Sequence, residues 1–204
     1  MNSHSEMLNS YEKSLRNPEN GVGQLNPSEW DIHIFLSKLG TVEKIPEDNN
    51  KNPDFMIKDE KLVFEVKSIN TAYGEKIDEN NVKINMKNER QFIEKFNFTL
   101  TDIQQKFNNY PNAFSIGALW IEHLQHTMIL LKFNEEFIRK TKFPETKLDG
   151  LIIYFEPTGN RTNNKKPFLF SKSIQLDRIF NKHYPKNELT IINLLDKRGK
   201  LHFS

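Results

Sequence analysis

The chain has 204 residues, no cysteine and a formal net charge of +2. This length fits one domain, and the lack of cysteine excludes disulfide frameworks, zinc–thiolate sites and cysteine nucleophiles. No apolar run approaches the roughly 18 residues that span a bilayer, and the start, MNSHSEMLNS, lacks the apolar region of a secretory signal. We therefore expect a cytoplasmic protein with no membrane partner.

Charge is distributed unevenly along the chain. Residues 132–204 carry a net charge of +7 and residues 1–131 a net charge of −5. The basic C-terminal portion could contact phosphates, or it could be a solvated lysine-rich surface. The acidic remainder would need a cation before it could accept a phosphate.

The first half of the chain predicts an arm, a helix and a strand pair. Residues 1–27 are rich in Asn, Ser, Gly and Pro and predict an N-terminal arm, which leaves 28–204 as a single domain. Ser28 as an N-cap and apolar residues at helical spacing predict a helix from 28 to 39. Strand patterns follow at 41–45, 54–57 and 62–67, and the polar turn 58–61 joins the last two.

The second half alternates helical and strand patterns. Helical spacing returns at 89–96 and 100–107, with Thr99 and Asp102 as a cap between two helices. Strands are predicted at 113–121, 128–133 and 151–155, helices at 134–140 and 174–180, and a final hairpin at 189–195 and 200–203. The sheet therefore continues through the second half of the chain.

A polar cluster on the strand pair carries the chemistry. Glu65 and Lys67 project from one face of their strand because side chains alternate, so this face is chemical and the opposite face belongs to the core. Asp54 opens the neighbouring strand, and its carboxylate could meet that of Glu65 across the hairpin. Paired carboxylates repel unless a cation neutralises them, and hard oxygen ligands suit Mg²⁺ or Mn²⁺. The Lys67 ammonium could orient or deprotonate a water, or stabilise charge on a phosphate, so the cluster could hydrolyse a phosphodiester.

These residues resemble the motif of the PD-(D/E)xK nuclease superfamily, which includes restriction endonucleases and repair nucleases. The motif residues are Pro53, Asp54, Glu65 and Lys67, and the order of elements agrees over residues 28–121. The resemblance implies an α/β fold with a restriction-endonuclease-like core, in which helices flank a mixed central β-sheet. It implies that Asp54, Glu65 and Lys67 are catalytic, and that Asp54, Glu65 and the backbone carbonyl of Val66 hold Mg²⁺ or Mn²⁺.

The resemblance suggests two further catalytic residues. Many members carry an acidic residue on the first core helix, and Glu29 could fill that place, although its charge would equally favour a helix N-terminus. Members also often place a polar residue on the helix after the ExK strand. That pattern points to Gln104 ahead of Gln105, although either side chain could face solvent.

A basic stretch in the second half could contact nucleic acid. Arg161, Lys165 and Lys166, with Lys172 nearby, offer phosphate donors between two apolar strand patterns. The stretch is either a loop that contacts nucleic acid or a solvated hairpin tip.

The resemblance implies a metal-dependent nuclease with a role in restriction, defence or repair. It favours DNA over RNA as the substrate, and endonuclease over exonuclease action. Many such nucleases work as homodimers because two strands must be cut. One alternative is a non-catalytic module on the same fold that binds nucleic acid or a protein partner. A second is a surface salt bridge between Glu65 and Lys67 on an edge strand, which would leave Asp54 unexplained.

Overall fold

The computed structural model describes residues 27–46, 51–69, 86–121, 134–155 and 166–195. The helices are α2 (Pro27–Leu36), α3 (Met86–Gln105), α5 (Asn134–Lys140), α6 (Ile174–His183) and the short 3₁₀ helix η2 (Phe143–Glu145). The strands are β1 (Glu43–Lys44), β2 (Phe55–Ile57), β3 (Leu62–Ile69), β4 (Phe114–Ile121), β5 (Gly150–Phe155), β6 (Phe168–Ser171) and β7 (Thr190–Asn193).

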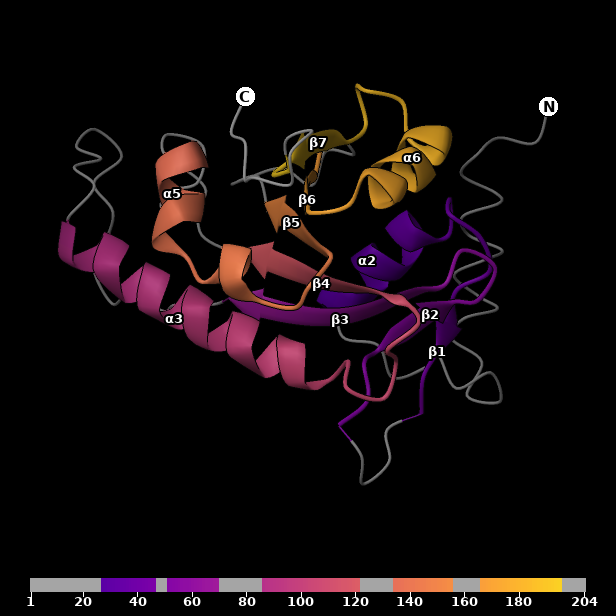
Figure 1. Cartoon of the computed structure of the whole chain (residues 1–204), viewed down its shortest axis with the longest axis horizontal. Coiled ribbons are helices and arrows are strands. Elements are labelled where there is room, and N and C mark those ends of the chain that lie inside the picture. The colour runs from indigo at the N-terminus through magenta and orange to yellow at the C-terminus, as the bar shows by residue number, and fades with distance from the viewer. Residues whose placement is uncertain (1–26, 47–50, 70–85, 122–133, 156–165, 196–204) are drawn as a thin grey trace.

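Within the described residues the strands form one seven-stranded mixed sheet in chain order (Figure 1). Strands β1, β2 and β3 pair antiparallel, whereas β3, β4 and β5 are parallel. Parallel neighbours need a crossover connection, and α3 lies in the one between β3 and β4. At the far edge, β6 pairs antiparallel with β5 and parallel with β7. The predicted α/β fold, a mixed sheet flanked by helices, is confirmed.

Helices cover both faces of this sheet, each over its own apolar cluster (Figure 1). On one face, Phe96 of α3 and Phe137 of α5 pack with Val63 of β3. On the other, α2 and α6 pack over Phe64 and Val66 of the same strand. Because both faces are buried, β4 and β5 are almost wholly apolar rather than alternating, whereas Glu65, Lys67 and Ser68 interrupt the apolar run of β3.

Most predicted elements are present, and one prediction is wrong. The pattern at 28–39 forms α2 and the turn that follows it, and Gly40 then leaves the helix at a φ of 152° that favours glycine. The two helices predicted at 89–96 and 100–107 are instead the single helix α3. Thr99 lies inside it, where its hydroxyl donates to the Lys95 carbonyl at 2.9 Å, so Thr99 caps nothing.

Several predictions fall outside the described residues. They concern the arm up to residue 26, the strand at 128–133 and the second strand of the final hairpin at 200–203. The first strand of that hairpin contains β7, which pairs parallel with β6. In the part of the chain that the structure describes, no helix is long and apolar enough to cross a membrane.

Candidate active site

Asp54 lies at a β-bulge where the chain enters β2. Its backbone N–H donates to the Phe64 carbonyl at 2.9 Å, although Phe55 is the register partner of Phe64. Asp54 and Phe55 therefore both lie opposite Phe64. A bulge of this kind turns a side chain out of the regular alternation of the strand. The Asp54 carboxylate accepts a hydrogen bond from the Val66 N–H at 2.7 Å. The bulge thus ties Asp54 to the strand that carries Glu65 and Lys67.

Glu65 is buried at the centre of the sheet. Its side chain is 1% exposed and shares its face of β3 with the core residues Val63 and Ile69, beneath α3. The prediction of one chemical face and one core face is therefore wrong, because both faces of β3 contribute to the core. The alternative of a surface salt bridge on an edge strand also does not hold, since β3 lies between β2 and β4.

Two ammonium groups approach the same oxygen of Glu65. The Lys67 Nζ lies 3.0 Å from Glu65 Oε1 and 3.3 Å from Asp102 Oδ2. The Lys106 Nζ lies 3.7 Å from Glu65 Oε1 and 3.4 Å from the Asn52 carbonyl oxygen. The other oxygen, Glu65 Oε2, is buried and finds no hydrogen-bond partner among the described residues. One side of this carboxylate is therefore neutralised, and the other is open to a donor or a cation.

The electrostatics of the two carboxylates are coupled. Burial and the charge of Asp54 raise the pKa of Glu65 to about 7, against the lowering effect of Lys67 and Lys106. Burial also raises the pKa of Asp54, although the Val66 N–H and a hydrogen bond with Glu65 oppose this rise. The negative charge of Asp54 therefore makes ionisation of Glu65 less favourable. A pair of this kind is suited to hold either a proton or a metal ion.

Lys67 remains an ammonium in this setting. Burial lowers its pKa, but the Glu65 and Asp102 carboxylates outweigh burial and leave the pKa raised. A lysine that keeps its proton can orient a water or stabilise negative charge. It is poorly suited to deprotonate a water, which was the other role open to it.

The carboxylate pair fits a hard divalent cation. Asp54 and Glu65 supply carboxylate oxygens, and the buried Glu65 Oε2 lacks a donor. The N–H and C=O of one strand residue point to the same side, so the Val66 carbonyl faces the side on which its N–H meets Asp54. Across the described ranges, no three His, Asp or Glu side chains gather as a metal site. The Val66 carbonyl could supply a further oxygen ligand.

The other predicted catalytic residues lie on the helices α2 and α3. Glu29 is 9% exposed in the first turn of α2, which packs on the face of β3 opposite to Glu65 and Lys67. Gln104 accepts a hydrogen bond from the Lys147 N–H at 2.9 Å and so ties α3 to the loop before β5. Gln105 accepts from the Lys51 Nζ at 2.6 Å. Gln105, rather than the preferred Gln104, therefore contacts the segment that leads to Asp54.

The predicted phosphate contacts are mostly unrelated to this site. Arg161 and Lys165 lie outside the described residues, and Lys166 is exposed before β6. The Lys172 Nζ donates to the carbonyls of Phe143 at 3.2 Å and Thr146 at 2.6 Å. Its ammonium is therefore bound to the backbone around η2, which is a structural role.

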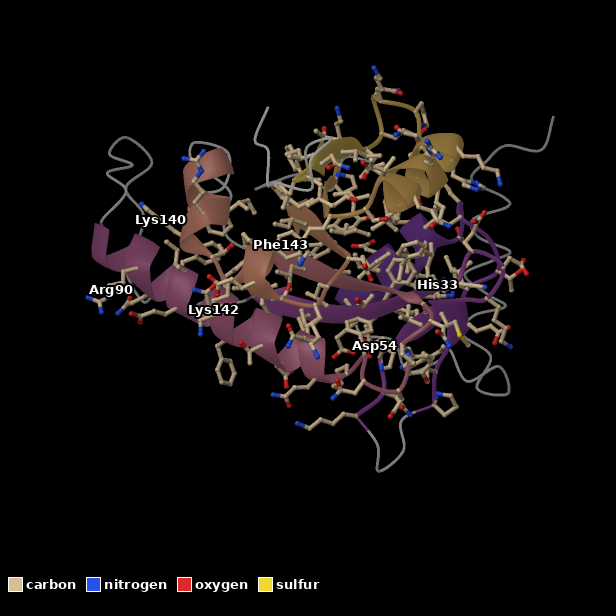
Figure 2. The ribbon with its side chains drawn as sticks, in the orientation of Figure 1. His33, Asp54, Arg90, Lys140, Lys142 and Phe143 are labelled. Carbon is tan, nitrogen blue, oxygen red and sulfur yellow. The ribbon has the colours of Figure 1, made fainter. Side chains whose placement is uncertain are left out.

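Two site residues, Asp102 and Lys106, were not identified from the sequence as functional. Asp102 lies in the last turn of α3 and Lys106 directly follows the helix. Asp102 contacts Lys67, whereas Lys106 contacts Glu65 and the Asn52 carbonyl. Figure 2 shows that this end of α3 lies near Asp54. Their spacing of four residues puts them on one face of a helix, which was the available signal. The signal is weak alone, because charged pairs at this spacing are common on solvated helices.

No protein-family model, no curated protein and no solved structure matches the chain. The likeness to PD-(D/E)xK nucleases therefore rests on the motif residues. Any functional conclusion has to follow from the chemistry of the site.

Proposed function

We propose that the protein is a metal-dependent nuclease that hydrolyses phosphodiester bonds in DNA. One observation supports this most strongly: Glu65 is buried beside a second carboxylate, Asp54, and one of its oxygens has no donor in the described structure. A purely structural ion pair would gain nothing from the second carboxylate, since like charges in a buried place destabilise each other. A divalent cation removes that repulsion.

Each residue of the site has a separate role in the proposed reaction. Asp54, Glu65 and the Val66 carbonyl would hold Mg²⁺ or Mn²⁺, which when bound polarises the phosphate and lowers the pKa of a water. Lys67 stays protonated, so it stabilises the negative charge that develops on the phosphate oxygens. Asp102 holds the Lys67 ammonium from the helix side, at 3.3 Å.

Three finer features of the proposal come from the motif resemblance alone. They are a restriction-endonuclease-like core, endonucleolytic cleavage of DNA in restriction, defence or repair, and a homodimer. A closed circular plasmid tests the mode of cleavage, because an exonuclease has no end at which to begin on it.

The direct test is cleavage by purified protein. Closed circular plasmid, linear duplex DNA and labelled RNA are each incubated with Mg²⁺, Mn²⁺ or EDTA. We expect nicked or linear plasmid with either metal and none with EDTA, and loss of cleavage in Asp54→Asn and Glu65→Gln. Asp59→Asn is the control, because Asp59 is an exposed carboxylate in the turn between the same two strands.

Two results would overturn the proposal. One is the absence of cleavage of every substrate with both metals. The other is cleavage by Asp54→Asn and Glu65→Gln at the wild-type rate. DNA binding that is indifferent to Mn²⁺, together with no cleavage, would instead favour the non-catalytic binding module.

A further inference from the structure

The C-terminal end of α3 brings a second lysine to the carboxylate pair. Lys106 directly follows the helix, and its side chain is 25% exposed. Its Nζ lies 3.7 Å from Glu65 Oε1 and 3.4 Å from the carbonyl of Asn52, two residues before Asp54. One ammonium thus reaches both segments that carry the proposed metal ligands.

Lys106 and Lys67 have different partners. Lys67 lies within 3.3 Å of two carboxylates, those of Glu65 and Asp102. Lys106 has one carboxylate at the longer distance of 3.7 Å and one neutral carbonyl. A carbonyl accepts a hydrogen bond but carries no net charge to neutralise an ammonium. The charge of Lys106 is therefore the more available of the two to an incoming anion.

The charges of the cluster balance in one particular state. When all groups are ionised, three carboxylates (Asp54, Glu65 and Asp102) face two ammoniums (Lys67 and Lys106), which leaves one negative charge in excess. A divalent cation changes this to one positive charge, and a phosphodiester carries one negative charge. With Lys106 present, the cluster is neutral when it holds one divalent cation and one phosphate.

We propose that Lys106 is a phosphate-binding residue of this site. With a divalent cation held by Asp54 and Glu65, the attraction of Glu65 for Lys106 would be weaker, and the Lys106 ammonium would be available to bind a phosphate of the nucleic-acid strand. This inference rests on the proposed nuclease function and adds a substrate contact to it. An ammonium recognises a phosphate as a point charge, so Lys106 would bind the backbone of any sequence.

The test removes the charge of Lys106 and keeps a donor for Asn52. Lys106→Gln does this, and Lys106→Arg restores a cation. Lys95→Gln is the matched control, because Lys95 is an exposed lysine of α3, the helix that Lys106 directly follows. For each variant, Mn²⁺ affinity is titrated without nucleic acid. The affinity for a labelled DNA duplex is then measured in Ca²⁺ over a series of salt concentrations, and kcat and KM are measured in Mg²⁺.

We expect Lys106→Gln to bind Mn²⁺ at least as tightly as wild type, because a repelling cation is gone. Its DNA affinity should fall about tenfold, KM should rise more than kcat falls, and the slope of log affinity against log salt should drop by about one. Lys106→Arg should recover most of the affinity and the slope, and Lys95→Gln should match wild type.

Two outcomes overturn the inference, and they are distinguishable. If wild type cleaves but Lys106→Gln keeps the wild-type salt slope and loses Mn²⁺ affinity, Lys106 only positions the carboxylates and the nuclease proposal stands. If wild type neither binds Mn²⁺ nor cleaves, the nuclease proposal fails and the role of Lys106 fails with it.

Discussion

Two partly buried lysines, Lys67 and Lys172, have opposite electrostatic settings. Lys67 lies between the Glu65 and Asp102 carboxylates, and its pKa is raised although burial lowers it. Lys172 lies over the ring of Phe143 and donates to backbone carbonyls, and burial lowers its pKa to about 8. Burial alone therefore does not mark a functional lysine. The two lysines differ in the charge of their partners, because the carboxylates beside Lys67 supply negative charge that a metal ion could use.

The carboxylates near the two lysines differ in the same way. Near Lys172, Asp149 Oδ2 accepts from the Ser115 N–H at 2.9 Å and from the Ser115 hydroxyl at 3.0 Å. At the candidate active site, the buried Glu65 Oε2 has no donor in the described structure. The fold satisfies the Asp149 carboxylate, whereas one oxygen of Glu65 has no donor among the described residues.

The largest expected effect separates these two carboxylates. Glu65→Gln removes a proposed metal ligand, so cleavage should fall about 10³-fold, the equivalent of about 4 kcal/mol of transition-state stabilisation. Asp149→Asn should leave kcat unchanged and lower the free energy of unfolding by about 1–2 kcal/mol. Plasmid cleavage rates and urea unfolding of both variants measure the difference. Equal losses of cleavage would show that Glu65 has no special role.

The next effect separates the two lysines. Lys67→Met removes the ammonium proposed to stabilise the reacting phosphate, and cleavage should fall about 10²-fold or more. Lys172→Met leaves the Thr146 carbonyl without its ammonium donor, so the unfolding free energy should fall by about 1–2 kcal/mol with kcat unchanged. Single-turnover cleavage below the unfolding temperature distinguishes the variants. A loss of cleavage in Lys172→Met would contradict its structural assignment.

Local sequence patterns could predict only part of the candidate active site. Asp54, Glu65 and Lys67 belong to one hairpin, so local alternation and a short turn were enough to bring them together. The burial of Glu65 was not predictable in this way, because it depends on the tertiary packing of α3 against that face of the sheet. Alternation along β3 says little when both faces are buried.

The sequence pattern missed Lys106 and wrongly suggested Lys172 as a phosphate contact, and the cause is the same in both cases. Lys106 is about 40 residues from the motif and reaches it only because α3 ends beside Asn52. Lys172 follows a basic stretch and so resembled a phosphate contact, but packing against η2 gives it internal partners. Charge is visible in a sequence, whereas the partner of each charge is set by packing.

Stability should depend on pH through Glu65. Its pKa rises from 4.5 to about 7 in the folded protein, so between these values the folded state holds a proton that the unfolded state releases. The free energy of unfolding attributable to Glu65 therefore falls as pH rises from 4.5 to 7, by on the order of 3 kcal/mol. Burial lowers the pKa of His33, so the contribution of His33 to the free energy of unfolding rises with pH in this range. Urea unfolding of wild type and Glu65→Gln is measured in EDTA, and the difference cancels the His33 contribution. The difference reports Glu65 together with Asp54, because the two carboxylates affect each other. It should shrink on acidification; a pH-independent difference would contradict the prediction.

The smallest effect concerns Asp102, which acts on the site through Lys67. Its side chain is 41% exposed, and an exposed ion pair of this kind contributes at most about 1 kcal/mol, or about fivefold in rate. Asp102→Asn should therefore lower kcat about two- to fivefold and leave Mn²⁺ affinity unchanged. The loss of kcat should become smaller at high salt, because salt screens the ion pair. Glu94→Gln, in the exposed pair with Arg90 on the same helix, is the control and should change nothing. A loss of cleavage near that of Glu65→Gln, together with a loss of Mn²⁺ affinity, would instead make Asp102 a metal ligand, because a residue that only holds Lys67 cannot exceed the effect of Lys67→Met.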